Sequence, residues 1–350
     1  MMKILIIGNM GYVGPAVIKE LARCHPDAVL HGYDNAYFAH CLTGAQTLPE
    51  RHLEKQFFGD VRKIPEGMLD GYTAVVQLAA ISNDPMGSRF AAMTKEINQE
   101  ATVRIARQAA RENVKNFVFA SSCSVYGVAS GEPRKEGDAL SPMTDYARSK
   151  IDSEEALGGI GGDMVITNLR FATACGMSER LRLDLVLNDF VACALSQKKI
   201  TVLSDGTPWR PLIDVMDMGR AIDWAVQRDA STGGRILSIN TGSNQRNHQV
   251  RDLAYAVAEA VPGTSVSINE GAAVDSRSYK VDFSLYESLA PHHQPQMTLN
   301  DSIQGLIDGL TRMNFKDADF RGSDLMRLQV LQGHVDEGRL TDTLAWDSDQ

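Results

Sequence analysis

Three side chains in this sequence have the types and the spacing of a proton-transfer site. Tyr146 and Lys150 are four positions apart, so on a helix they share one face with Cβ atoms about 5–6 Å apart. A cation beside a phenol favours the phenolate and moves its pKa, ordinarily about 10, towards the range useful for acid–base work. Ser122 ends an apolar run upstream of this pair, where its hydroxyl can hold a reacting oxygen. Together the three residues predict an oxidoreductase site.

Short apolar runs alternate with segments of helical periodicity through the first half of the chain. The apolar runs predict strands at 4–7, 29–33, 74–78, 117–120 and 165–169. The periodic segments predict helices at 14–24, 93–112 and 146–157. This alternation predicts an α/β fold, a doubly wound parallel sheet of the Rossmann type.

The regular alternation fades after about residue 170, where short elements and loops follow, and 215–240 again has the pattern of a helix and a strand. We therefore expect a Rossmann domain formed by 1–170 and 213–242. A smaller, discontinuous substrate-binding α/β domain would comprise 171–212 and 243–350. Within it, 326–344 is an amphipathic tail, best explained by packing or by contact with a second copy.

A glycine-rich turn follows the first predicted strand and opens the first predicted helix. Gly8, Gly11 and Gly14 allow a tight turn, and the helix N-terminus, with Tyr12 and Val13, can receive a pyrophosphate. These residues predict a dinucleotide site.

An acidic residue ends the second predicted strand. Asp34 lies about twenty residues beyond the glycine turn, where a carboxylate accepts hydrogen bonds from adenosine ribose hydroxyls. The residue after it is Asn35, and no Lys or Arg follows closely to bind a 2′-phosphate, so the pattern favours NAD over NADP. The other interpretation of Asp34 is a solvated turn residue.

Composition narrows the classes of function. With 350 residues, 43% of them hydrophobic, the chain can bury a full core, and its net charge of −9 gives no support to binding nucleic acid or an anionic membrane. No stretch is long and apolar enough to span a membrane, so we expect a soluble, cytoplasmic protein. The cysteines are too scattered to predict a disulfide framework or a metal site; they are Cys24, Cys41, Cys123, Cys175 and Cys193.

In their order and spacing, these motifs resemble those of the extended short-chain dehydrogenase/reductase family, the NAD-dependent nucleotide-sugar epimerases and dehydratases. The resemblance covers most of the chain. Besides Ser122, Tyr146 and Lys150 it rests on the glycine turn, Asp34, Asp60, Val61, Leu78, Ala79, Ala80 and Asn98.

On the cofactor side, the resemblance implies that Asp60 and Val61 lie near the adenine. Leu78, Ala79 and Ala80 would lie beside the cofactor, with the two alanines at its ribose. Asn98 would be a structural helix residue.

At the reacting centre, Lys150 would bind the nicotinamide ribose. Tyr146 would take a proton from a sugar hydroxyl while hydride leaves the same carbon for NAD, and Ser122 would hydrogen-bond that oxygen.

The resemblance extends to the substrate, a nucleotide-diphosphate sugar. Asn188, Arg210 and Arg277 correspond to residues that contact the diphosphate, and arginine suits this role because its planar guanidinium binds phosphate in a bidentate manner. A surface ion pair is the other interpretation of Arg210. Thr173 stands where many sugar epimerases have Asn.

The pair after the catalytic serine bears on the reaction. Nucleotide-sugar 4,6-dehydratases carry Asp-Glu where this chain has Cys123 and Ser124, and a thiol and an alcohol are poor substitutes for those acids. The pair therefore favours reversible 4-epimerisation. The alternatives are net dehydrogenation or reduction at C4, a non-conventional dehydratase, and a dinucleotide-binding sensor without turnover.

Two further assignments concern the pocket and the assembly. Asn83, Asp84 and Met86 follow the fourth predicted strand and either shape the sugar pocket or form an Asp-Pro turn. Cys123 fits a small packing residue better than an acid or base. The family commonly dimerises through two helices, so we expect a homodimer through 93–112 and 146–157.

Overall fold

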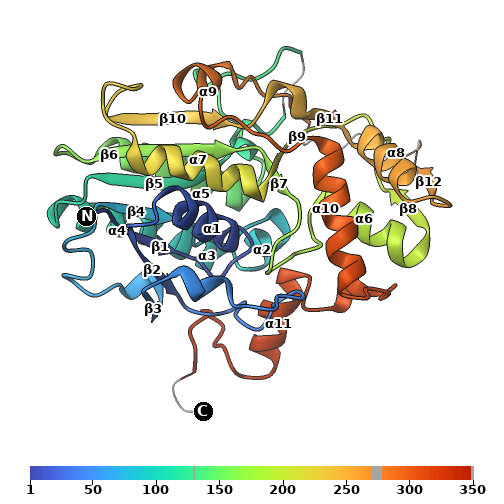
Figure 1. Ribbon diagram of the computed structural model, residues 1–350, viewed down its shortest axis with the longest axis horizontal. Helices are drawn as coiled ribbons and strands as arrows, with labels where there is room; N and C mark the ends of the chain where they lie inside the picture. Colours follow the sequence, from blue (N-terminus) through green and yellow to red (C-terminus); the bar gives the residue numbers. More distant parts are fainter. Residues whose placement is uncertain (129–130, 270, 272–277, 348–350) are drawn as a thin grey trace.

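A seven-stranded sheet forms the centre of the computed structural model, which describes residues 1–128, 131–269, 271 and 278–347 (Figure 1). Its order is β10-β6-β5-β4-β1-β2-β3, and every neighbouring pair is parallel. The strands are β1 (Lys3–Ile7), β2 (Val29–Asp34), β3 (Lys55–Phe58), β4 (Ala74–Gln77), β5 (Asn116–Ser122), β6 (Val165–Phe171) and β10 (Ile236–Thr241). The predicted doubly wound parallel sheet is confirmed. Its order reverses at β1, between β2 and β4, which is where ligands bind in such sheets.

Alternation along the central strand shows why both faces are covered. Ile4 and Ile6 of β1 enter one hydrophobic cluster, and Leu5 and Ile7 enter another, all with no exposed surface. The first cluster packs under α1 (Gly14–Cys24) and α7 (Val215–Gln227), which lie side by side in Figure 1. The second packs under α3 (Ala91–Thr94), α4 (Ala101–Arg111) and α5 (Asp145–Gly158).

The predicted helix at 93–112 is not a single α-helix. Between α3 and α4 the chain forms a π-helical turn, η3 (Lys95–Glu100). Such π-helical turns occur frequently at functional sites. The turn contains Asn98, whose side chain is buried.

The remaining elements form a smaller region beside the carboxyl ends of the main strands. It contains a three-stranded sheet of β7 (Thr173–Cys175), β9 (Trp209–Asp214) and β11 (Asn247–Gln249), and a parallel pair, β8 (Lys199–Val202) with β12 (Ser265–Ile268). Its longer helices, α6 (Val186–Gln197), α8 (Val250–Ala260) and α10 (Leu299–Arg312), contact one another. The intervening α7 and β10 pack into the main sheet, the return that the pattern at 215–240 suggests.

Short elements complete the fold. They are α2 (Asp84–Arg89), α9 (Ser284–Leu289), α11 (Arg327–Asp336) and the 3-10 turns η1 (Pro49–His52), η2 (Val61–Lys63), η4 (Cys123–Tyr126), η5 (Asn244–Arg246) and η6 (Phe320–Gly322). The segment that begins with α11 lies at the lower edge of the molecule in Figure 1, below β2. It packs on the same hydrophobic cluster as one face of the main sheet. None of the helices described has both the length and the apolar character that crossing a membrane requires.

Candidate active site

One large cavity, of about 970 Å³, collects most of the predicted site residues at the carboxyl ends of the main strands. The predicted residues that line it are Gly8, Gly11, Tyr12, Val13, Asp34, Asn35, Val61, Leu78, Ala79, Ala80, Asn83, Asp84, Met86, Ser122, Ser124, Tyr146, Lys150, Thr173 and Arg210. Those described but not lining it are Gly14, Asp60, Asn98, Cys123 and Asn188. Arg277 lies outside the described residues.

The glycine turn has no room for side chains at two positions. Gly8 has φ +84°, and a Cβ built there would lie 2.4 Å from the backbone nitrogen of Ala79. A Cβ on Gly14 would lie 1.8 Å from the carbonyl oxygen of Asn9. Bare backbone therefore closes the turn against β4 and leads into the N-terminus of α1, an arrangement that fits a pyrophosphate.

Gly14→Ala is expected to abolish retention of NAD, because the methyl group overlaps the Asn9 carbonyl and forces the turn apart. Bound nucleotide, released by denaturing the purified variant and quantified by chromatography, measures this. The control is Gly305→Ala on α10, since a Cβ at Gly305 meets nothing within 4 Å. Normal NAD content in folded Gly14→Ala protein would contradict the assignment.

Asp34 is held at the end of β2 by two backbone donors. Its carboxylate accepts hydrogen bonds from the Met10 nitrogen at 2.9 Å and the Ala36 nitrogen at 2.8 Å. Burial raises the pKa of Asp34, and these hydrogen bonds oppose the shift. The side chain lines the cavity, so an acid is positioned where a ribose hydroxyl can donate to it. Glycine turn and acid together fit a dinucleotide.

Asp60, which the resemblance places near the adenine, binds an arginine. The Arg62 side chain donates to both carboxylate oxygens of Asp60, with Nη2 to Oδ2 at 2.6 Å and Nε to Oδ1 at 3.0 Å. Its neighbour Val61 does line the cavity. The carboxylate of Asp60 thus orients Arg62.

Asn98 fixes the loop after β4. Its side chain accepts from the Ile81 nitrogen at 2.7 Å and donates to the Ile81 oxygen at 3.0 Å, so it satisfies both backbone groups of one residue. It also donates to the Ser149 hydroxyl at 3.1 Å. Because Ile81 lines the cavity and Ser149 lies on α5, Asn98 acts by positioning both.

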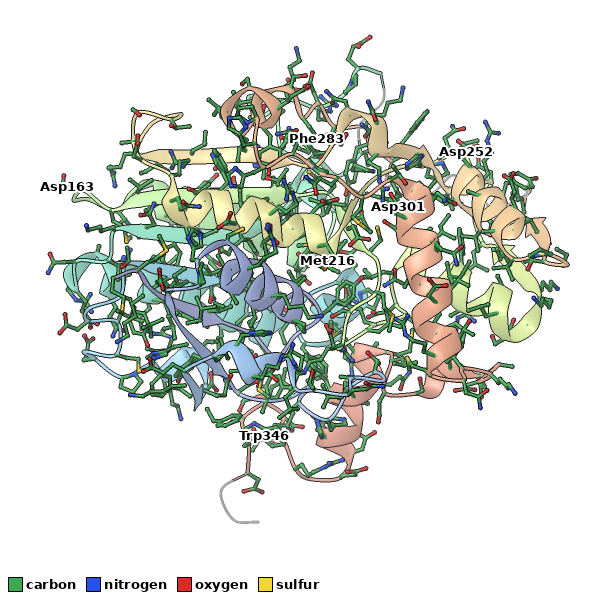
Figure 2. All side chains as sticks on the ribbon, viewed as in Figure 1. Asp163, Met216, Asp252, Phe283, Asp301 and Trp346 are labelled. Carbon is green, nitrogen blue, oxygen red and sulfur yellow. The ribbon has the colours of Figure 1, made fainter. Side chains whose placement is uncertain are left out.

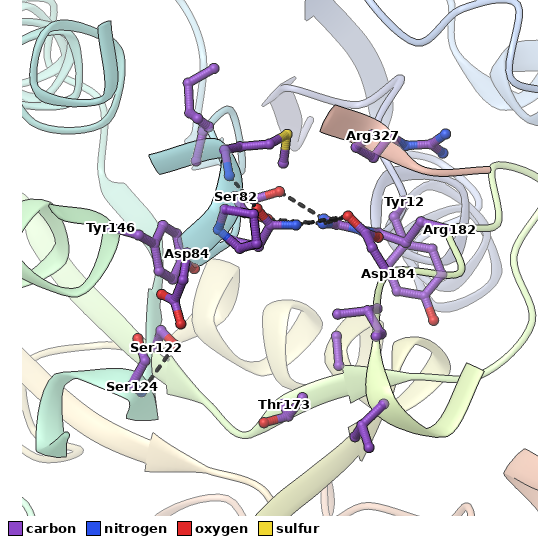
Figure 3. Close-up of a pocket in the computed structure, with 18 of the residues that line it drawn as sticks. Tyr12, Ser82, Asp84, Ser122, Ser124, Tyr146, Thr173, Arg182, Asp184 and Arg327 are labelled. Carbon is purple, nitrogen blue, oxygen red and sulfur yellow. Dashed lines mark hydrogen bonds and ion pairs between the residues drawn. The ribbon is translucent and has the colours of Figure 1, made fainter. Parts of the chain in front are cut away.

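Ser122, Tyr146 and Lys150 meet in the cavity as the spacing predicts. Thr144 caps α5 by accepting from the Ala147 nitrogen, so Tyr146 lies in the first turn and Lys150 one turn later. The Lys150 Nζ lies 5.5 Å from the centroid of the Tyr146 ring and donates to the Ala120 carbonyl at 2.7 Å. Figure 3 shows Tyr146 near Ser122 at the end of β5.

The expected lowering of the phenol pKa is wrong for this site. Burial raises the pKa of Tyr146 to about 12, although a hydrogen bond with Ser122 lowers it in part. Burial also lowers the pKa of Lys150 to about 7, opposed by the charge of Glu154. The sequence reveals the spacing of the pair, but burial is the largest cause of the pKa shift of both groups.

The low pKa of Lys150 predicts a pH-dependent stability. It is about 7 in the folded protein and ordinarily 10.5, so between these values the unfolded chain binds more protons and the free energy of unfolding rises with pH. Below pH 7 the burial penalty is fully present. Urea denaturation across this window should show wild type gaining stability relative to Lys150→Met, whereas parallel curves would contradict the shift.

A buried ion pair lies one helical turn beyond Lys150, and the sequence analysis did not identify it. Arg170 of β6 donates to Glu154 through Nη2 at 2.7 Å and through Nε at 3.1 and 3.0 Å, and both side chains are less than 10% exposed. Ser121 also donates to Glu154, and Arg170 donates to the Tyr126 hydroxyl. Tyr146, Lys150 and Glu154 thus follow one face of α5 at intervals of four.

The two residues after Ser122 have different surroundings. Cys123 has no exposed surface, and its thiol donates to the Arg170 carbonyl at 3.0 Å. Burial raises the pKa of this thiol, as expected of a packing residue. The Ser124 hydroxyl is buried at the cavity without a hydrogen-bond partner among the described residues.

The loop before α2 forms a further part of the cavity wall, beside Tyr146. Asn83 caps α2 by accepting from the Met86 nitrogen, and its amide donates to Asp184 at 2.7 Å. A Cβ on Gly87 would lie 3.3 Å from Tyr146, so this glycine allows α2 to pack closely on α5. Asp84 follows Asn83 and lines the cavity.

Arg182 is a cavity residue that the sequence analysis missed. It donates to Asp184 through Nε at 2.6 Å and Nη2 at 2.8 Å, and through Nη1 to the Ser82 hydroxyl at 2.8 Å. Figure 3 shows this pair across the cavity from Tyr146. Its positive charge lowers the pKa of Tyr146. Arg182 was missed because no motif marks it; its role arises from a contact between distant segments.

The described residues that correspond to a diphosphate site differ in their position relative to the cavity. Asn188 is buried and donates to the Tyr12 hydroxyl at 3.0 Å and to the Arg182 carbonyl at 2.9 Å. It therefore connects the glycine turn to the segment that contains Arg182. Arg210 lines the cavity on β9, beside Tyr279, and donates to the Trp209 carbonyl. Only Arg210 of these two reaches the cavity.

Comparison with known proteins identifies the family to which this chain belongs. A model of the NAD dependent epimerase/dehydratase family matches residues 4–240, which include the glycine turn, Asp34 and the Ser-Tyr-Lys set. The chain belongs to this family. The predicted family and its NAD cofactor are confirmed.

Other members of the NAD-dependent epimerase/dehydratase family match nearly end to end. The Bacillus subtilis protein named "Uncharacterized UDP-glucose epimerase YtcB" is 25% identical over 329 residues, 89% of this chain and 99% of that protein. A UDP-glucuronic acid 4-epimerase from Bacillus cereus, solved with NAD, has a TM-score of 0.74 at 22% identity and covers 91% of this chain and 99% of its own. The NDP-hexosamine 5,6-dehydratase TunA has a TM-score of 0.75 at 20% identity, covering 91% and 100%. The two structures establish the fold.

Proposed function

We propose that this family member is an NAD-dependent nucleotide-sugar 4-epimerase. The observation that carries the proposal is the meeting of Ser122, Tyr146 and Lys150 in the cavity that the glycine turn and Asp34 also line. These groups suit removal of a proton and a hydride from a carbinol. The neutral pair of Cys123 and Ser124 favours epimerisation over 4,6-dehydration, since neither is a carboxylic acid.

Each side chain has a distinct task in this reaction. Tyr146 accepts the proton of the C4 hydroxyl and later returns one to the ketone oxygen, while Ser122 holds that oxygen by a hydrogen bond. NAD, when bound, would supply the hydride acceptor and donor for C4, and its positive charge would favour the phenolate. Lys150, fixed by the Ala120 carbonyl, orients the cofactor ribose. The buried Ser124 hydroxyl supplies a further polar contact to the sugar.

The diphosphate of the substrate requires cationic partners in the smaller region. Arg210 lines the cavity on β9 and is assigned to this role, because a guanidinium can bind two phosphate oxygens together. Thr173 on β7 also lines the cavity and is assigned to the sugar. Support for a UDP-linked substrate comes from neighbours solved with UDP sugars, such as MoeE5 with UDP-glucuronic acid.

A non-conventional dehydratase is the second candidate, and Asp84 is the observation that favours it. This carboxylate lines the cavity, and its charge raises the pKa of Tyr146. A carboxylate beside a ketone intermediate can remove the proton from the adjacent carbon. Elimination of water would follow where the next carbon carries a hydroxyl, and the hydride taken from C4 would then be returned to the unsaturated ketone, so that the net change is the loss of one water.

Liquid chromatography coupled to mass spectrometry, applied to a nucleotide-sugar panel incubated with the protein and NAD, separates these reactions, because the chromatography resolves isomers of equal mass. Epimerisation leaves the mass unchanged and produces a second sugar isomer without accumulation of NADH. Dehydration lowers the mass by one water. Net C4 dehydrogenation accumulates NADH and a ketone. A protein that binds NAD yet changes no sugar in the panel would leave the sensor hypothesis in place of the proposal. The homodimer through 93–112 and 146–157 remains a prediction.

A further inference from the structure

The end of the cavity beyond Asp34 is walled by the C-terminal segment. Arg327 and Leu331 of α11 line the cavity together with Asn35, Tyr37 and Phe38, which follow β2. In Rossmann sheets this end receives the adenosine half of a dinucleotide. A segment from the far end of the sequence therefore contributes to the surface that an adenosine would contact.

The loop after Asp34 is bound directly by this C-terminal segment. The Trp346 indole donates to the Asn35 carbonyl at 2.6 Å, and the Tyr37 hydroxyl donates to the Leu344 carbonyl. His334 Nε2 lies 3.0 Å from the Tyr37 carbonyl. The rings of Tyr37 and Trp346 are 5.9 Å apart between centroids. Figure 2 shows Trp346 below the segment that follows β2.

A second attachment involves the carboxylate that the family resemblance assigns to the adenine. Asp60 orients Arg62, and Arg62 Nη1 in turn donates to the Thr343 carbonyl at 2.7 Å. Arg62 Nη2 also approaches the Leu344 carbonyl at 3.3 Å. The turn η2, which follows β3 and contains Arg62, is thereby bound to the C-terminal segment.

The start of α11 is fixed by a buried guanidinium. Arg327 is 2% exposed, lies 5.0 Å from the centroid of the Phe38 ring and donates to the Arg180 carbonyl at 2.7 Å. Arg327 thus joins the loop after β2 to the segment that leads into the smaller region. Helix α11 is held at its start, and the chain beyond it is held by Tyr37 and Arg62.

We propose that residues 327–347 are a component of the cofactor site that closes its adenosine end and slows dissociation of NAD. The inference rests on the proposed function, because an epimerase that returns its hydride to the same substrate requires no cofactor exchange. The attachments of Asn35, Tyr37 and Arg62 hold this segment at the adenosine end of the cavity.

Exchange of bound NAD against isotopically labelled NAD, followed by mass spectrometry without any sugar, tests the inference. Trp346→Ala removes one hydrogen bond and the ring contacts with Tyr37 and His334, so exchange should accelerate about ten-fold, the factor that 1.4 kcal/mol represents. Trp346→Phe keeps a ring, so its rate of NAD exchange should lie between those of wild type and Trp346→Ala. Tyr255→Ala is the control, since Tyr255 is an exposed aromatic of α8, and it should exchange as wild type does.

A chain ending at Asp336 provides a second variant that lacks Thr343, Leu344 and Trp346 together. It should exchange NAD faster than Trp346→Ala and should lose cofactor during gel filtration. Wild-type exchange rates in both variants would overturn the inference, even with full epimerase activity. Fast exchange in the variants of a protein that converts no sugar would overturn only the proposed function. If the shortened chain does not fold, the Trp346 pair alone decides.

Discussion

Tyr146→Phe is expected to reduce kcat for sugar interconversion by about 10²–10⁴-fold, the usual contribution of a positioned acid–base group. The change removes one oxygen from a residue that lines the cavity and leaves its backbone and Cβ beside Gly87 unchanged. Without that oxygen, the side chain at position 146 cannot accept the proton of the C4 hydroxyl. Steady-state turnover of the active nucleotide sugar, measured at saturating substrate, gives the size of the loss.

The loss must be separated from a failure to fold or to bind NAD. The Tyr146→Phe variant should therefore retain the thermal midpoint and the bound NAD of wild type, since the Ala120 carbonyl still holds Lys150. Tyr255→Phe on the exposed face of α8 removes a hydroxyl far from the cavity and should keep full activity. Undiminished kcat in Tyr146→Phe would rule out the assigned proton transfer.

Glu154→Ala is expected to lower the free energy of unfolding by about 3–5 kcal/mol, the usual cost of leaving one partner of a buried ion pair uncompensated. Glu154 and Arg170 are both less than 10% exposed. Without the carboxylate, the guanidinium keeps only its neutral partners, which include the Tyr126 hydroxyl and the Glu136 carbonyl. Urea denaturation followed by fluorescence gives the value.

The adjacent residue offers a matched control. Glu155 lies on the exposed side of α5, and Glu155→Ala should change the free energy of unfolding by no more than about 0.5 kcal/mol. Glu154→Gln preserves an acceptor for Ser121 while removing the charge, so it should fall between the two alanine variants. Equal stabilities of Glu154→Ala and Glu155→Ala would show that Arg170 is satisfied without its partner.

The parts of the site that were predictable are local in sequence. Gly8, Gly14 and Asp34 act through the geometry of one turn and one strand end, and the interval from Tyr146 to Lys150 fixes their shared helix face. Such features are set by a few neighbouring residues, so their residue types reveal them. The same holds for the alternating faces of β1, which predict a sheet covered on both sides.

The parts that were missed depend on long-range contacts. Arg182 reaches Ser82 across 100 positions, and Trp346 reaches Asn35 across 311. Neither lies in a recognisable motif, because its partner is determined only by the completed fold. The pKa of Tyr146 was misjudged for a related reason: helical spacing gives the distance to Lys150, whereas burial by α2 and the smaller region sets the local dielectric environment.

The hydrogen bond from Trp346 to Asn35 also sets an order of events during synthesis. The glycine turn and Asp34 are translated before residues 327–347, so Trp346 can reach Asn35 only after the intervening chain has been made. Domains form from the N-terminus as the chain emerges, so the turn and Asp34 can be in place before the segment that we propose to close the adenosine end. Firm retention of NAD would then begin only after residues 327–347 have been made and have bound Asn35.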